Sequence, residues 1–148
     1  MRFKLFKIIF STRAQDLHIA GHSTIQNAKD SDITLIISRK WNSPGTILTM
    51  NACTKQLKPF TALREDGSVY LIQGLPSLKI NASDVSKVQD ADDMDMLERP
   101  LDEIAKALLE YRTINVAGNA ENNAPGIENQ SFNLFYDIFS RMKKLLSL

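Results

Sequence analysis

Between residues 33 and 81, apolar and polar positions alternate in short runs that turn-forming residues separate. In the first run Ile33, Leu35 and Ile37 share one parity, and only Ile36 interrupts the two-residue period. This period is typical of a strand with one buried face. After a Ser-Pro-Gly turn signal, residues 46–53 alternate again, so we predict a second strand there.

The pair Asp66-Gly67 separates two further runs, 60–65 and 68–73. An Asp-Gly pair between β-rich segments predicts a hairpin with a type I′ turn, because that turn needs positive φ at both residues. A short last strand is expected at 78–81, and the basic, aromatic segment 1–10 is expected to add a strand to the sheet. Residues 12–32 are hard to assign, with a strand broken at Gly21 as one interpretation.

The period changes to a helical one in the second half of the chain. Pro100 and the acidic residues after it suit a helix start, and we predict a helix at about 98–113. Residues 115–130 are rich in Asn and Gly and predict a loop. A second helix is predicted from Ser131 to about Leu146.

These elements predict an α+β fold: a predominantly antiparallel meander sheet of about six strands, followed by two C-terminal helices. Closure of the sheet into a small barrel is kept as an alternative. The predicted organisation is a β domain with a packed helix at 1–114, the loop at 115–130 and an amphipathic helix at 131–148.

The last helix has a wide apolar stripe. One interpretation is that the stripe closes the core, and the other is that it docks on a partner as a helix in a groove. For the second interpretation the predicted partner-binding residues are Phe132, Phe135, Ile138, Phe139, Met142, Leu145 and Leu146.

Composition sets the broad class. The 148 residues are 43% hydrophobic and 24% charged, as in ordinary globular proteins, and no run is long enough to span a bilayer. The net charge of +1 hides an asymmetry: residues 1–74 carry ten Lys or Arg against five Asp or Glu, and residues 75–148 carry eight against twelve. We expect no signal peptide, because Lys7 interrupts the apolar N-terminal segment. The expected location is cytoplasmic or within an assembled particle.

Few residues suggest chemistry. His18 and His22 have the spacing of metal ligands on a helix, but the Glu of an HExxH motif is missing. Together with Asp16 they carry an alternative hypothesis, a small metal-dependent hydrolase. The acidic residues from Asp90 to Asp95 do not fit a calcium loop. The single Cys53 is expected to be a small buried hydrophobe.

Another alternative is a nucleic-acid-binding small β-barrel. Its basic and aromatic patch would combine Arg2, Lys4 and Lys7 with Phe3 and Phe6, and would extend to Arg39, Lys40 and Trp41. Aromatic residues in strands more often belong to the core, so nucleic acid is not the expected partner.

The leading hypothesis is a non-catalytic assembly subunit of a larger complex, for example a viral (phage) particle or a secretion machine. No catalytic, cofactor or metal site is predicted. A protein partner or a homo-oligomer is expected, with no integral membrane association, and the last helix is the predicted docking element.

Overall fold

The computed structural model describes residues 7–10, 17–72, 75–76, 80, 96–97, 101–118 and 126–147. Its strands join in the order β1-β7-β2-β3-β4-β5, and β6 also pairs with β4. The bounds are Lys7–Phe10 for β1, Ile33–Ile37 for β2, Phe60–Leu63 for β3, Val69–Ile72 for β4, Leu75–Pro76 for β5, Met96–Leu97 for β6 and Thr113–Gly118 for β7.

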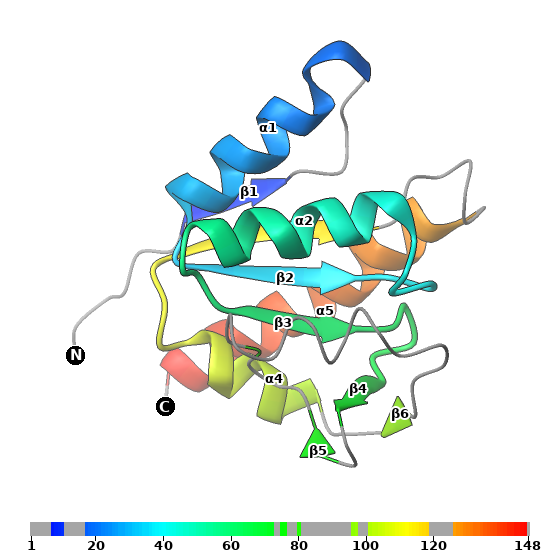
Figure 1. Ribbon diagram of the computed structural model, residues 1–148. Helices are drawn as coiled ribbons and strands as arrows, with labels where there is room; N and C mark the ends of the chain where they lie inside the picture. Colours follow the sequence, from blue (N-terminus) through cyan, green and yellow to red (C-terminus); the bar gives the residue numbers. More distant parts are fainter. Residues whose placement is uncertain are drawn as a thin grey trace.

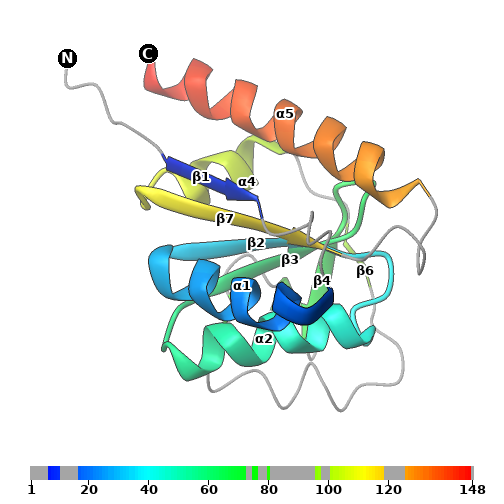
Figure 2. The ribbon, with the colours of Figure 1, turned by 90° about the horizontal axis from the view of Figure 1, so that it is seen from above.

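The predicted antiparallel meander was wrong. Strands β1, β7, β2 and β3 all run parallel, and the antiparallel pairing among the described residues involves β4 and one bridge between Phe60 of β3 and Ile80. The strands form an open row from β1 to β5 instead of a closed barrel. Figure 1 shows β2 and β3 side by side, and Figure 2 shows the late strand β7 between β1 and β2.

Helices cover both faces of the sheet (Figure 2). Helices α1 (Leu17–Asp30) and α2 (Pro44–Lys55) pack on one face, and α4 (Leu101–Leu108) and α5 (Ile127–Leu146) pack on the other. Parallel strands need long crossover connections, which here are the helices. Two apolar cores result, one on each side of the sheet.

Strand β2 explains why the alternation was misleading. All five of its residues are buried, because Ile33, Leu35 and Ile37 face the α4–α5 core while Ile36 faces the α1–α2 core. A short run that is buried on both faces is the pattern of a central parallel strand. The interruption at Ile36 was therefore the informative position.

Residues 46–53, predicted as a strand, lie in helix α2. Pro44 occupies the first turn, where its missing N–H costs nothing. The buried residues Thr46, Thr49, Met50 and Cys53 follow helical spacing. The uncertain segment 12–32 likewise contains a helix, α1, in spite of Gly21.

The Asp66-Gly67 hairpin is confirmed. Leu63 of β3 pairs with Val69 of β4, and Gly67 has the expected positive φ of 89°. Asp66 lacks the positive φ that a type I′ turn needs, so the predicted turn type was wrong. Asp66 Oδ1 accepts a hydrogen bond from the Ser68 N–H at 2.8 Å. A Cβ on Gly67 would lie 3.0 Å from Leu101 Cδ2, so α4 packs directly over the turn.

In the C-terminal half, strands β6 and β7 were not predicted, and α4 ends at Leu108, before the predicted end at about 113. Both helices exist, as α4 and α5, but the predicted loop 115–130 contains most of β7 at its start and the first turn of α5 at its end. The N-terminal strand is present as β1, parallel to β7. In the expected last strand, 78–81, only Ile80 is described, and it bridges to Phe60.

Candidate functional site

Two places on the molecule can be compared as functional sites: the edge of the sheet where the parallel strands end, and the outer face of α5. In open α/β sheets, ligands bind beyond the carboxyl ends of the strands, where neighbouring connections leave to opposite faces. Here α2 follows β2 on one face and α5 follows β7 on the other. The carboxyl edge of the sheet at β2 and β7 is therefore one candidate ligand site.

The side chains at the carboxyl edge mainly bind each other. Arg39 Nε donates to Glu65 Oε1 at 2.8 Å, and Arg39 Nη2 donates to Gln130 Oε1 of α5 at 2.7 Å. The second carboxylate oxygen of Glu65 is buried and accepts no hydrogen bond from the described residues. Arg39 thus ties the ends of β2 and β3 to the start of α5.

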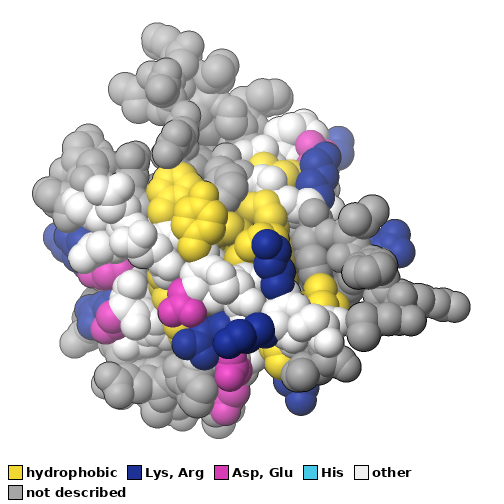
Figure 3. Space-filling view, turned by 180° about the vertical axis from the view of Figure 1, so that it is seen from behind, with side chains coloured by type: hydrophobic (Ala, Val, Ile, Leu, Met, Phe, Trp, Pro, Cys, Tyr) yellow, Lys and Arg dark blue, Asp and Glu magenta, His cyan; other side chains and the backbone are white. Residues whose placement is uncertain are grey.

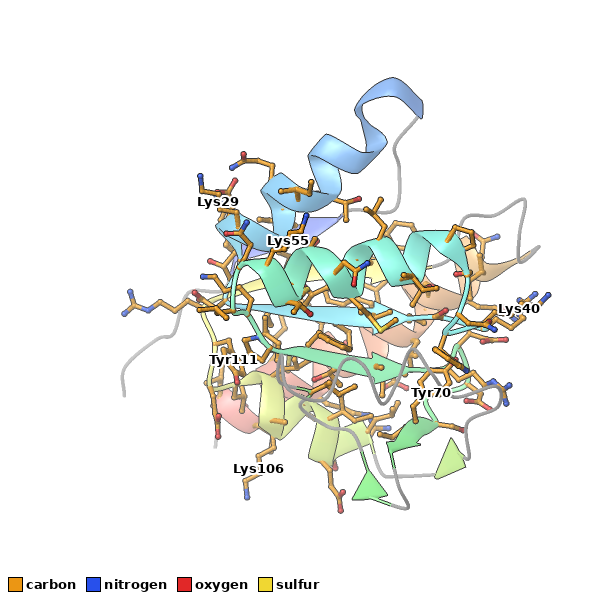
Figure 4. The ribbon with its side chains drawn as sticks, viewed as in Figure 1. Lys29, Lys40, Lys55, Tyr70, Lys106 and Tyr111 are labelled. Atoms are coloured by element: carbon orange, nitrogen blue, oxygen red, sulfur yellow. The ribbon has the colours of Figure 1, made fainter. Side chains whose placement is uncertain are left out.

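A hydroxyl network lies at the same edge. Ser43 donates to Thr46 at 2.9 Å, and the hydroxyls of Ser38 and Thr46 lie 3.0 Å apart. The side chain of Tyr70 is buried, and its hydroxyl donates to the carbonyl of Ser38. Burial raises the pKa of Tyr70 to about 12. Figure 4 shows Tyr70 and Lys40 toward the end of the sheet to which the strand arrows point. These bonds fix the loop that leads into α2.

The side chains proposed for the metal-dependent hydrolase lie outside the described part of the structure. His18 and His22 fall within α1, but their side chains are not described, and neither is Asp16. Among the residues that the structure describes, no three His, Cys, Asp or Glu side chains form a group that could hold a metal ion. The metal-dependent hydrolase therefore stays an untested prediction.

Cys53 is buried in α2. Burial raises the pKa of its thiol, and a hydrogen bond with Thr34 offsets only part of this effect. A neutral thiol without access to solvent is a packing residue.

The patch predicted for nucleic acid is divided. Lys7 begins β1, whereas Arg39 and Lys40 follow the end of β2, so they lie at opposite edges of the parallel sheet. Trp41 is only 6% exposed and belongs to the α1–α2 core. Arg2, Phe3, Lys4 and Phe6 lie outside the described residues.

Helix α5 uses one stripe to complete the core. Of the seven predicted partner-binding residues, Phe135, Ile138 and Met142 are buried, and the partly buried Phe139 and Leu145 pack against the same core. Their burial is what the core-closing interpretation requires. The docking role stays a prediction, and in this structure it can concern only the residues on the outer side of the helix.

The outer side of α5 carries a second row of large side chains. Phe132, Phe139 and Leu146 are half-buried, and Tyr136, which the sequence interpretation omitted, is 58% exposed. We call the row Phe132, Tyr136, Phe139, Lys143 and Leu146 the outer seam. Its spacing of four, three, four and three residues could have revealed it, because this is the heptad repeat of a helix that packs on another helix.

The aromatic rings of the outer seam support one another. Phe132 stacks on Tyr136 at 6.2 Å between ring centroids, and Phe135 stacks on Phe139 at 5.8 Å. Lys143 Nζ lies 5.1 Å from the centre of the Phe139 ring. Such contacts hold the side chains in place before any partner arrives, which reduces the entropy lost on binding.

The outer seam faces away from α4. Arg141 Nη1 donates to Asp102 of α4 at 3.0 Å, so this side of α5 is occupied. Residues two apart on a helix project in nearly opposite directions, and Lys143 therefore lies on the other side. Figure 3 shows hydrophobic patches across the face on which α5 lies, with basic side chains beside them.

Comparison with protein-family models, with curated proteins and with solved structures finds no match to this chain. Within the described ranges no helix is both long and apolar enough to cross a membrane.

Proposed function

We propose that this protein is a non-catalytic docking module, an assembly subunit that binds another protein through the outer seam of α5. The observation that carries the proposal is that α5 has a second row of large side chains beside its core stripe, and among the described seam residues only Phe139 also packs against the core. Burial of large aromatic side chains is a main source of affinity in protein interfaces. Tyr136, at the middle of the seam, is the natural centre of the contact.

The carboxyl edge of the sheet supports a ligand site less well. Arg39, Glu65 and Gln130 bind each other there, and a ligand would have to displace these bonds. The exposed aromatic side chain of Tyr136 needs no such exchange. For this reason the docking function is preferred over small-molecule binding.

The proposal is tested by replacing Tyr136 with a photo-activated cross-linking amino acid in the organism that makes the protein. We expect one discrete cross-linked product, whose components are identified by mass spectrometry. The matched control places the same amino acid at Leu57, which is 82% exposed and follows α2 on the opposite face. The absence of a discrete product at position 136, or the same products at position 57, would contradict the docking function.

A further inference from the structure

We infer that the partner of the outer seam is a second copy of this chain, whose α5 packs against the first in the antiparallel direction. This inference rests on the proposed docking function and names its partner. It follows from the spacing of the seam and from the position of its one charged residue.

The seam spacing indicates a helical partner. Heptad positions a and d on one helix pack between side chains of a facing helix. With Tyr136 and Lys143 at a positions, Phe132, Phe139 and Leu146 fall at d positions. Helix α5 is 20 residues long, or about 30 Å, which is sufficient for a pair of this kind.

Charge decides the direction. In a parallel pair, equivalent a positions face each other, so Lys143 would lie against its own copy, and like charges repel. In an antiparallel pair, a positions face d positions. Lys143 then lies opposite Phe132 of the second copy, where an ammonium over an aromatic face is attractive.

The same register fills the centre of the contact. When Lys143 faces Phe132 of the second copy, Tyr136 faces the second copy's Phe139, and both contacts occur twice by symmetry. Asn129, at the a position before Tyr136, and the bordering residues Asn133 and Ser140 are exposed and uncharged, so they set no like charges against each other. The seam is thus complementary to itself in the antiparallel direction.

The first test compares two charge reversals by sedimentation or light scattering of the full chain over a range of concentrations. We expect the unaltered protein to dimerise, and Lys143→Glu to raise the dimer dissociation constant about tenfold or more, because two cation–π contacts become repulsive. Lys144→Glu is the matched control, since the neighbouring lysine is exposed but lies off the seam. Its dissociation constant should stay within about twofold of the unaltered value.

A variant at the centre of the seam tests independently whether the chain dimerises through it. Tyr136→Arg places a charged guanidinium in both central layers of the helix pair and should leave the protein monomeric. Because Tyr136 is 58% exposed, the folded chain should tolerate the change, and urea unfolding verifies this. A dimer that responds equally to Lys143→Glu and Lys144→Glu, or that survives Tyr136→Arg, would overturn the inference.

The direction is measured with a spin label on Ser147→Cys, which is exposed just beyond the seam, while the buried Cys53 is shielded from labelling. The antiparallel register separates the two labelled positions by about 28 Å, from a rise of about 1.5 Å per residue, whereas a parallel pair brings them to about 10 Å. The shorter distance would overturn the antiparallel arrangement.

The cross-linking experiment separates the two proposals. A Tyr136 product with twice the mass of the chain supports both. A product with a different polypeptide, from a chain that is monomeric in solution, keeps the docking function and refutes the second copy. A monomer that yields no product refutes both.

Discussion

At the scale of single residues, polar groups inside the fold are bonded to specific partners. Tyr70 is 2% exposed, and its hydroxyl donates to the Ser38 carbonyl. Asn115 of β7 is fully buried and donates to the Thr34 hydroxyl of β2 at 3.3 Å. A buried polar group without its partner costs about 1–3 kcal/mol. These pairs therefore help to fix the register of the sheet and the loop before α2.

The raised pKa of Tyr70 gives a pH-dependent prediction. Because folding holds the phenol neutral, its stabilising contribution is complete below the unfolded pKa of about 10 and is lost as pH rises toward about 12. Tyr70→Phe should lower the free energy of unfolding by about 1 kcal/mol at neutral pH. Above pH 10 the difference between the two proteins should shrink.

Urea unfolding at pH 8, 10 and 11 measures these free energies, with the exposed Tyr136→Phe as control. A constant difference between the unaltered protein and Tyr70→Phe across this range would show that Tyr70 does not titrate as expected.

At the scale of elements, the proposed function gives α5 two roles on two sides. Its inner residues complete the α4–α5 core, so they determine whether the chain folds. Its outer seam, apart from Phe139, lies outside that core, and in the proposed function it binds the partner. Substitutions on the two sides should therefore separate stability from association.

Ile138→Ala should lower the free energy of unfolding by about 2–5 kcal/mol, because Ile138 is fully buried. Tyr136→Ala should change the stability of the monomer by no more than about 0.5 kcal/mol while weakening association. Denaturant titration and light scattering of both variants check this separation. Equal loss of stability in the two variants would mean that the outer seam belongs to the core.

The sequence predicted elements whose signals are local. The Asp66-Gly67 turn and the last helix depend on neighbouring residues, and both are present. Strand β7 was missed because Asn115 and Gly118 resemble loop residues, and only the partner Thr34 across the sheet explains a buried Asn. Helix α2 was missed because its threonines and isoleucine suit a strand, although Pro44 marked a helix start.

The same limit applied to the candidate site. The apolar stripe of the last helix was visible in the sequence, but which of its residues face the sheet depends on how α5 packs. Phe135, Ile138 and Met142 proved to be inner, whereas Tyr136 is the exposed residue. The parallel order of the strands was also invisible, since it depends on pairing between distant segments.

At the scale of the whole molecule, the ion pair between Arg39 and Glu65 helps to connect the sheet to helix α5. Arg39 follows β2, Glu65 follows β3, and Gln130 belongs to α5 on one face of the sheet. The two charged side chains are 30% and 17% exposed, so solvent screens the pair only in part. The hydrogen bonds of Arg39 to Glu65 and to Gln130 therefore link the sheet to α5.

Removing Arg39 should cost more than removing the pair. Arg39→Ala leaves the mostly buried Glu65 carboxylate without its partner, and we expect a loss of about 1–3 kcal/mol. Adding Glu65→Ala should recover part of that loss, with a coupling energy of about 1 kcal/mol in a double-mutant cycle of unfolding free energies. Strictly additive effects would mean that the pair does not couple the two strands.

The place of β7 has a consequence for synthesis of the chain. A ribosome makes β1 and β2 long before residues 113–118, yet β7 must be inserted between them. Until that segment emerges, β1 has no neighbour among the described strands, and one side of β2 presents bare backbone donors and acceptors. Late insertion of a central strand slows folding and prolongs the time in which nascent chains can aggregate. Chaperone demand should therefore be greatest just before β7 leaves the exit tunnel.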